Sequence, residues 1–453
     1  MAMEAQIQVP VHVPLHSKPM GVWESFRAGR RNLLELIPEI ATRQPMVSGR
    51  TVKRWHMVMD PGANRRILKD RVEDYPKSDV TKMILAPAIG DSLFIAEGSH
   101  WHWQRRAAAP AFSPRNVQAL APVMTAAAER AAARFSRASG GIINVFDDMV
   151  SATFEVISDV TFSGGEAFDR DGVHKAIEAY IASTARLSLL DIIGAPPWVP
   201  RPARLFSAPA MRAMKSMADA AINQRRDRPS TGIPDLLDLL LDGEDPETRR
   251  RMNTAELRDN LLTFIVAGHE TTALTLAWAL YLCAFDPAVQ ARARTEAQAV
   301  LGRRAATVAD LPALGYVRQV VDEALRLYPP AAFLSRTAIA HDELCGREVR
   351  PGDTVMLPIY ALHRNHLLWR DPDRFDPDRF ADSKSIDRFA YLPFGGGPRI
   401  CIGASFALQE AVIILATLLA RFRFAPVEGK TPQPVLILTL RPEGGVWLKT
   451  ADA

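Results

Sequence analysis

Apolar and polar residues recur with a helical period through most of the first half of the chain. The period covers Pro110 to Phe135, Ser151 to Thr161 and Val173 to Ile192, which predicts amphipathic helices. Four prolines between positions 196 and 202 interrupt it, and the charged stretch 225–232 predicts a solvent-exposed loop. Neither interruption has the length of a linker between domains.

A longer helix is predicted in the middle of the chain. Asn253, with a glutamate three residues later, forms the pattern of a capping box, and the apolar pattern continues to Phe285, where Asp286-Pro287 ends it. About 32 residues at ~1.5 Å each would span about 48 Å. The pair His269-Glu270 interrupts the most apolar part, and such a pair at the centre of a bilayer costs several kcal/mol. We therefore expect a helix buried in protein.

Strand signals are few and lie late in the chain. A helix around Val317 to Tyr328 is ended by Pro329-Pro330. Beyond it, Glu348-Val349 and Thr354 to Leu357 flank the turn Pro351-Gly352-Asp353, which predicts a small β-hairpin. The pattern as a whole predicts a mainly α protein with a small β-rich lobe.

Composition narrows the class of protein. The 453 residues allow two or three domains or one large one, and 48% hydrophobic with 23% charged residues is typical of a globular protein. A net charge of +4 without a basic tail argues against a nucleic-acid partner. The first forty residues lack an apolar signal segment, and the apolar run Ala411 to Ala420 is half of the ~20 residues that a spanning helix needs. We expect a cytoplasmic protein without a membrane anchor.

One of the three cysteines has a distinctive setting. Cys283 and Cys345 lie in an apolar helix and beside a turn glycine, whereas Cys401 follows the glycine run 395–397 and precedes a helical pattern from Ala404 to Phe422. A helix N-terminus favours a thiolate and lowers the thiol pKa. Such a thiolate is a nucleophile or a metal ligand. No sequence signature supplies the histidine base that a nucleophile needs, whereas a single axial thiolate is a complete protein ligand for haem iron.

The segment around Cys401 also resembles a known family. Phe394-x-x-Gly397-x-Arg399-x-Cys401-x-Gly403 matches the haem-ligand signature of the cytochrome P-450 superfamily. The resemblance extends from about Trp101 to Gly403 through four further motifs in the expected order. It implies the cytochrome P-450 fold as a single domain over residues 1–453, with haem b bound and Cys401 as its thiolate ligand.

The polar break in the long helix acquires a role from this resemblance. A zinc motif H-E-x-x-H is excluded because Ala273 stands where the second histidine is needed. From the residues alone, Glu270 and Thr271 could also satisfy each other or a neighbouring backbone group. The resemblance implies an acid–alcohol pair that relays protons to dioxygen.

Further motifs are implied to support the haem. Glu323-x-x-Arg326 and the later Arg379 would form a buried structural network behind the cysteine loop. Haem propionates need cationic or hydrogen-bonding partners when buried. The resemblance implies that the residues at or near the propionates are Trp101, Arg105, Arg336, His363 and Arg399.

The resemblance implies a haem-thiolate monooxygenase, which inserts one oxygen atom of O2 into a lipophilic small molecule such as a fatty acid, terpenoid, steroid or aromatic compound. Electrons would come from a separate ferredoxin, docked on a basic proximal surface, and an NAD(P)H-dependent ferredoxin reductase. The alternatives are a peroxygenase driven by hydrogen peroxide and a non-catalytic haem-binding protein. The positions implied to face substrate are the loop from Leu85 to Phe94 and the apolar residues Phe264, Ala267, Phe333 and Leu334.

Overall fold

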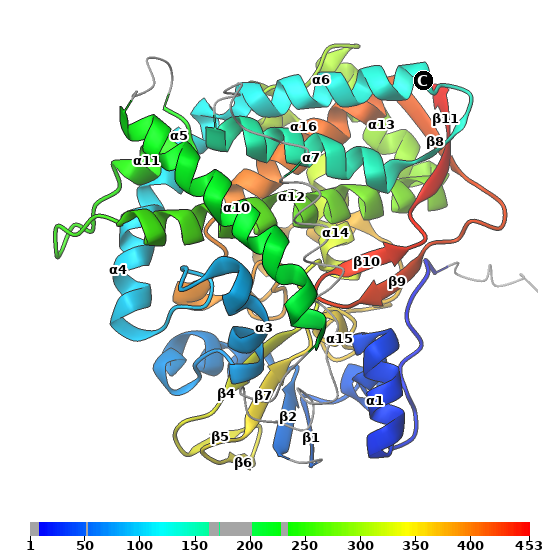
Figure 1. The fold of residues 1–453 in the computed structure, drawn as a ribbon. Helices are drawn as coiled ribbons and strands as arrows, with labels where there is room; N and C mark the ends of the chain where they lie inside the picture. The colour runs from blue at the N-terminus through cyan, green and yellow to red at the C-terminus, as the bar shows by residue number, and fades with distance from the viewer. Residues whose placement is uncertain (1–8, 51–52, 163–171, 173–201, 228–233) are drawn as a thin grey trace, which may run out of the picture.

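The computed structural model describes the chain except residues 1–8, 51–52, 163–171, 173–201 and 228–233 (Figure 1). The helix predicted at 173–192 lies outside the described residues. Short 3₁₀ and π segments link the main elements. The described α-helices are α1 (Val22–Arg31), α2 (Pro61–Arg65), α3 (Asp79–Ile89), α4 (Gly98–Ala108), α5 (Pro114–Ala119), α6 (Ala121–Arg137), α7 (Val145–Phe162), α10 (Pro202–Asp227), α11 (Leu236–Leu241), α12 (Thr254–Phe285), α13 (Pro287–Leu301), α14 (Gly315–Leu327), α15 (Ile359–Leu362) and α16 (Ala404–Arg421).

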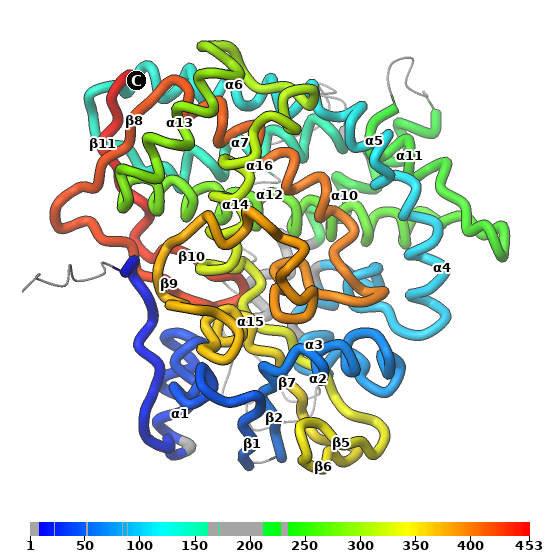
Figure 2. The backbone as a smooth tube through the Cα atoms, turned by 180° about the vertical axis from the view of Figure 1, so that it is seen from behind, coloured from blue at the N-terminus to red at the C-terminus, as the bar shows by residue number. Residues whose placement is uncertain are grey.

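The strands within the described residues are short and form four small sheets. They are β1 (Met46–Arg50), β2 (Arg54–Val58), β3 (Ile142–Asn144), β4 (Leu334–Thr337), β5 (Asp342–Leu344), β6 (Arg347–Val349), β7 (Thr354–Leu357), β8 (Phe422–Pro426), β9 (Gln433–Leu436), β10 (Leu440–Glu443) and β11 (Trp447–Asp452). The largest sheet has the order β1-β2-β7-β4. It lies at the opposite end of the molecule from α6 and α13 (Figure 2). The mainly α architecture with a small β-rich lobe is confirmed.

The predicted long helix is confirmed with both of its ends. Asn253 and Glu256 exchange two hydrogen bonds of 3.0 Å, side chain to backbone, so the first turn of α12 is closed. Pro287 starts α13 in a new direction, at 115° to α12. α12 contacts α7, α10, α14 and α16 and crosses the centre of the helical part (Figure 1). Trp278 in its last third is fully buried and stacks on Tyr328 with ring centroids 4.0 Å apart.

Two predicted boundaries differ from the structure. The pattern from Pro110 to Phe135 is not one helix: it divides into a 3₁₀ turn, α5 and α6, because the Ser113 hydroxyl accepts from the Asn116 N–H and starts a new helix at Pro114. The stretch 225–232 was predicted as a loop, but α10 continues to Asp227. Arg225 is held there by Asp235 and Asp238, at 2.8 and 2.6 Å.

The predicted hairpin between β6 and β7 is wrong in its pairing, although both strands exist. β6 pairs instead with β5 across the turn Cys345-Gly346, where both residues have positive φ, 52° and 71°. This backbone matches the twist of a two-residue hairpin. β7 enters the main sheet, parallel to β2 and antiparallel to β4. A strand's partner is set by long-range packing, which the local pattern does not contain.

One described helix, α16, is long and apolar enough to cross a membrane by length and composition. The apolar run at 411–420 is thus part of an 18-residue helix, of which 72% is buried within the protein. α16 packs against α6, α12, α13 and α14. Its apolar character is therefore accounted for by burial among helices.

The charged residues Glu323 and Arg326 form a fully buried ion pair on α14. Their side chains have no exposed surface, and the guanidinium donates two hydrogen bonds to the carboxylate at 2.6 and 2.8 Å. Arg326 also donates to the carbonyls of His363 and Pro372. Arg379 lies 3.4 Å from Glu323. The network predicted from the motifs is therefore assembled in the structure.

Removing one member of this network leaves a buried charge without its counter-charge. We predict that Glu323→Ala lowers the free energy of unfolding by about 3–5 kcal/mol, measured by chemical denaturation. The matched control is Asp378→Ala. Its pair with Arg292 has both side chains more than half exposed, so the loss should not exceed ~1 kcal/mol. Equal losses in the two variants would contradict a structural role for the buried pair.

Candidate functional site

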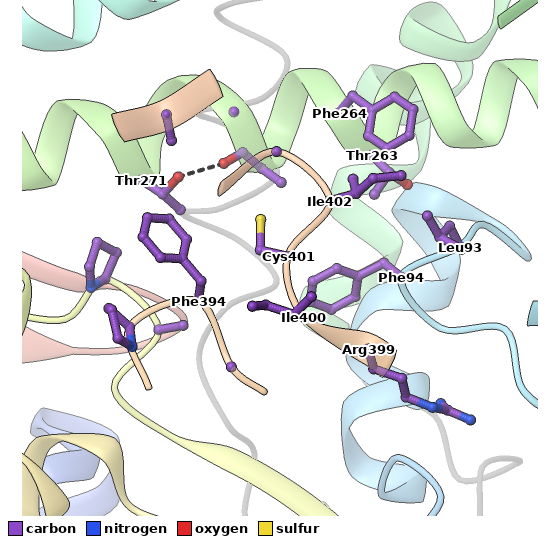
Figure 3. A pocket seen from close by; sticks show the side chains of 18 of the residues that line it. Leu93, Phe94, Thr263, Phe264, Thr271, Phe394, Arg399, Ile400, Cys401 and Ile402 are labelled. Carbon is purple, nitrogen blue, oxygen red and sulfur yellow. Dashed lines mark hydrogen bonds between the residues drawn. The ribbon is translucent and has the colours of Figure 1, made fainter. Parts of the chain in front are cut away.

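A cavity of about 530 Å³ lies between α12, the cysteine loop, α4 and the β9–β10 hairpin. Its lining is mostly apolar, with hydroxyl groups on α12 and cationic side chains at one edge. Figure 3 shows Cys401 and Thr271 on opposite sides of this space. Such a volume and lining are typical of a site for a small lipophilic molecule.

The cysteine loop is held by two backbone features. The Cys401 N–H donates to the Phe394 carbonyl at 2.9 Å. Gly397 has φ of +68°, and a Cβ at this position would lie 2.0 Å from the Leu68 carbonyl oxygen. Only glycine fits there. The loop therefore places Cys401 three residues before α16 begins, with its sulfur directed toward α12 (Figure 3).

The expected lowering of the Cys401 pKa is not found in the protein alone. Burial raises the pKa of the thiol, while the Gly403 N–H and the positive charge of Arg105 oppose that rise. The side chain is exposed only in the sense that it lines the cavity. Burial is therefore the largest effect on this thiol in the protein alone. A bound metal cation is the charge that converts a coordinating thiol into a thiolate.

Four cationic side chains line the cavity, namely Lys77, Arg105, Arg336 and Arg399. Three of them, Lys77, Arg336 and Arg399, lie close together. Burial lowers the pKa of Lys77 to about 7 and that of Arg336 to about 10, and the charge of Arg399 lowers both further. Glu97 is the ion-pair partner of Arg399. The Nε and Nη1 atoms of Arg399 are buried without hydrogen-bond partners. This excess of buried positive charge fits an anionic group such as the two propionates of haem.

Trp101 and His363 have different places relative to these cations. Trp101 is buried, lines the cavity and lies under the Arg399 guanidinium, 4.9 Å from it. His363 does not line the cavity. Its Nδ1–H donates to the Arg326 carbonyl and its Nε2 accepts from the Leu392 N–H, and burial lowers its pKa to about 3. The implied propionate contact of His363 is thus corrected: both ring nitrogens join the buried network to the cysteine loop.

Thr271 and Glu270 point in different directions from α12. Thr271 lines the cavity and donates a hydrogen bond of 2.7 Å to the Ala267 carbonyl (Figure 3). The Glu270 carboxylate is buried and is held by Arg441 and by the Thr439 hydroxyl, at 2.7 Å for the latter. Glu270 does not line the cavity, because its carboxylate is directed to these two partners beside α12. The implied acid–alcohol pair is therefore not in mutual contact.

The residues predicted to face substrate, Phe264, Ala267, Phe333 and Leu334, all line the cavity. The predicted loop from Leu85 to Phe94 is helical up to Ile89, so Leu85 lines the cavity from α3 and Leu93 and Phe94 line it from the loop that follows. Sequence reasoning missed several contributors, three of which are Phe112, residues 436–438 and Lys77. Phe112 packs edge-on against Phe264 with centroids 5.1 Å apart, and residues 436–438 reach the cavity from the β9–β10 hairpin. Lys77 is the third. A lone lysine or a short late strand carries no signal of its own in the sequence.

Comparisons with known proteins agree with this geometry. The family model described as Cytochrome P450 matches residues 45–449. The cyclooctat-9-en-7-ol 5-monooxygenase of Streptomyces melanosporofaciens is 33% identical over 93% of this chain and 90% of its own. The cytokinin hydroxylase of Arabidopsis thaliana is 33% identical over 80% of this chain and 71% of its own. A solved structure described as the cytochrome P450DA heme domain has a TM-score of 0.81 at 28% identity, covering 98% of both chains. The chain belongs to the cytochrome P450 family and is a monooxygenase of that family.

Proposed function

We propose that this protein is a haem-thiolate monooxygenase that hydroxylates a lipophilic small molecule, with Cys401 as the iron ligand. The observation that carries this proposal is the arrangement across the cavity. The Cys401 sulfur faces the segment of α12 that bears Gly268 and Thr271, and buried cations line one edge. A dianionic cofactor such as haem, held by Cys401, would suit these three features together.

Haem with a cysteine thiolate supplies the chemistry that activates dioxygen and splits its O–O bond. The chain's own residues would hold and enclose that group. Arg105, Arg336 and Arg399 would bind the propionates, and Trp101 would support Arg399 from below. Lys77 would add positive charge while its ammonium donates to loop carbonyls such as that of Phe94. The apolar lining of the cavity would exclude bulk water from the reaction.

Protons would reach the cavity from the α12 side. The Thr271 hydroxyl presents a transferable proton at the cavity surface, since a hydroxyl can accept one proton while donating another. Glu270 lies on the neighbouring face beside Arg441, whose side chain is 35% exposed. We assign Glu270 the role of proton source from the solvent side, with the alcohol of Thr271 as the last group of the relay.

The substrate would be a compact hydrocarbon with few polar groups. The wall carries the aromatic pair Phe112–Phe264 and the side chains of Phe94, Phe333 and Ile437. A relative is named for oxygenation of cyclooctat-9-en-7-ol, an unsaturated alcohol. Both facts favour a terpenoid-like cyclic substrate over a straight-chain fatty acid, whose carboxylate would need a cation in the distal part of the cavity.

Electrons would arrive from a separate ferredoxin and its NAD(P)H-dependent reductase. Three exposed cations lie near the cysteine loop. Lys69 follows Leu68, whose carbonyl lies against Gly397. Arg388 precedes Phe389, which packs on Gly396. Arg115 lies on α5, which contacts α16. This surface suits an acidic donor. Arg106 is not part of it, because Asp245 holds that side chain at 2.6 Å.

The central test is the spectrum of the reduced protein with carbon monoxide. We expect wild type to show the red-shifted Soret band of thiolate-ligated haem and Cys401→Ser to lose it, because the alcohol is a poor iron ligand. Cys283→Ser is the matched control, since Cys283 is buried in α12 away from the cavity. A histidine-type spectrum in folded wild type would refute the proposal.

The hydroxyl of Thr271 has a matched control one turn along the same helix. Thr275 also lines the cavity and also donates to a carbonyl four residues earlier, at 2.9 Å. With ferredoxin, reductase and NAD(P)H, we predict that Thr271→Val lowers product formed per NAD(P)H consumed and raises hydrogen peroxide release, by about 10-fold or more. Thr275→Val should change neither. If wild type and both variants form the same amount of product per NAD(P)H consumed, Thr271 is not part of the proton relay.

Arg336 tests whether the cationic edge is built for an anion. We predict that Arg336→Met stabilises the haem-free protein toward unfolding, because it removes a buried charge beside Arg399. The same change should accelerate haem loss to an apomyoglobin acceptor by about 10-fold or more, since a charge-assisted contact is lost. Arg350→Met, at an exposed site in the same lobe, is the control. Unchanged haem loss would exclude a propionate contact.

A further inference from the structure

The segment between α3 and α4 forms one wall of the cavity. Leu93 and Phe94 line the cavity, and Phe94 is 46% exposed, which for so large an aromatic side chain reflects its projection into this space (Figure 3). A loop in this position could open and close over a substrate. The hydrogen bonds made by its backbone indicate the opposite behaviour.

Two buried amide side chains hold this loop from the helices behind it. Asn260 on α12 has no exposed surface, and its Oδ1 accepts from the Leu93 N–H at 3.0 Å. Its Nδ2 donates to the Gln104 Oε1 and to the Glu256 carbonyl, both at 2.9 Å. Gln104 on α4 is equally buried and donates to the Asp91 carbonyl at 2.9 Å. The two amides in series therefore bind the loop at a donor and an acceptor two residues apart.

Neighbouring contacts leave the loop little freedom. Gly90 has φ of +55°, and a Cβ there would lie 1.8 Å from a carboxylate oxygen of Asp259, the residue before Asn260. On the other side, the Lys77 ammonium donates to the Phe94 carbonyl. The loop is thus fixed at both ends and in its middle. Moving it would leave buried amide groups unpaired, at a cost of about 1–3 kcal/mol for each group.

We propose that Asn260 and Gln104 are positioning residues that hold Leu93 and Phe94 as a preformed wall of the substrate cavity. Selection of the substrate's shape then occurs against a rigid surface, and no closure of this loop is needed. Neither amide touches the cavity, so both act through the loop backbone. The inference deepens the proposed function, because it assumes that the cavity above Cys401 receives the substrate.

The test compares amide replacements of similar volume in the haem-loaded protein. Gln104→Met and Asn260→Leu remove the hydrogen bonds to the loop. Gln290→Met is the matched control: Gln290 is also a buried amide that binds three backbone groups, at Cys283 and Phe424, but it lies on α13 outside the cavity. The first measurement is hydrogen exchange of the segment 90–96. We expect this segment to exchange about 10-fold faster than in wild type in the first two variants, and at the wild-type rate in the control.

The second measurement uses two probes that coordinate the iron, imidazole and 4-phenylimidazole, titrated by their spectral shifts. Imidazole is too small to need the wall, whereas the phenyl ring must pack against it. We expect the dissociation constant of 4-phenylimidazole to rise about 10-fold relative to that of imidazole in Gln104→Met and Asn260→Leu, because a loosened wall must be ordered on binding. The ratio should be unchanged in Gln290→Met.

Each outcome has a distinct meaning. An unchanged exchange rate in Gln104→Met would show that the two amides do not hold the loop. If Asn260→Leu fails to fold, Gln104→Met, whose side chain has a similar volume, is sufficient for the test. Faster exchange with an unchanged probe ratio overturns the role in selection. If wild type does not show the thiolate-type carbon monoxide band, the proposed function is overturned. The exchange comparison would still decide whether the amides hold the loop.

Discussion

The position of Cys401 depends on the buried ion pair between Glu323 and Arg326. Arg326 accepts from the His363 ring through its carbonyl, and His363 in turn accepts from the Leu392 N–H. Leu392 lies two residues before Phe394, whose carbonyl binds the Cys401 N–H. A charge pair without exposed surface is thus joined to the cysteine loop by hydrogen bonds through His363 and by the backbone from Leu392 to Phe394. A buried pair of this kind adds little net stability, but it penalises every arrangement that separates its charges.

The electrostatics of the site follow a second constraint. Lys77, Arg105, Arg336 and Arg399 line the cavity, and the carboxylate of Glu97 pairs with Arg399. Burial lowers the pKa of Lys77, Arg105 and Arg336, because desolvation disfavours their charged forms. An anionic cofactor in the cavity would relieve that cost. The positive charge of the protein and the negative charge of the cofactor would then compensate each other.

Helix α12 separates the chemical tasks by its faces. Phe264, Gly268 and Thr271 face the cavity, Glu270 faces Arg441 and the β9–β10 hairpin, and Asn260 faces the loop that carries Phe94. The capping box at Asn253 and the turn at Pro287 determine where the helix begins and ends. Because the helix is rigid between them, its position sets the cavity, the candidate proton route and the wall together.

Features encoded by neighbouring residues were predictable from the sequence: the ends of α12, the glycine-rich turn before Cys401, the motifs of the Glu323–Arg326 network and the mainly α fold. Each depends on groups within a few positions, where spacing alone defines the contact. Features that depend on distant segments were not. The partner of β7, the direction of Glu270, the place of His363 and the contribution of Lys77 each required knowing which remote backbone lies alongside. Tertiary packing decided them, because a side chain's polar partners and its burial are properties of the space around it and not of its neighbours in the chain.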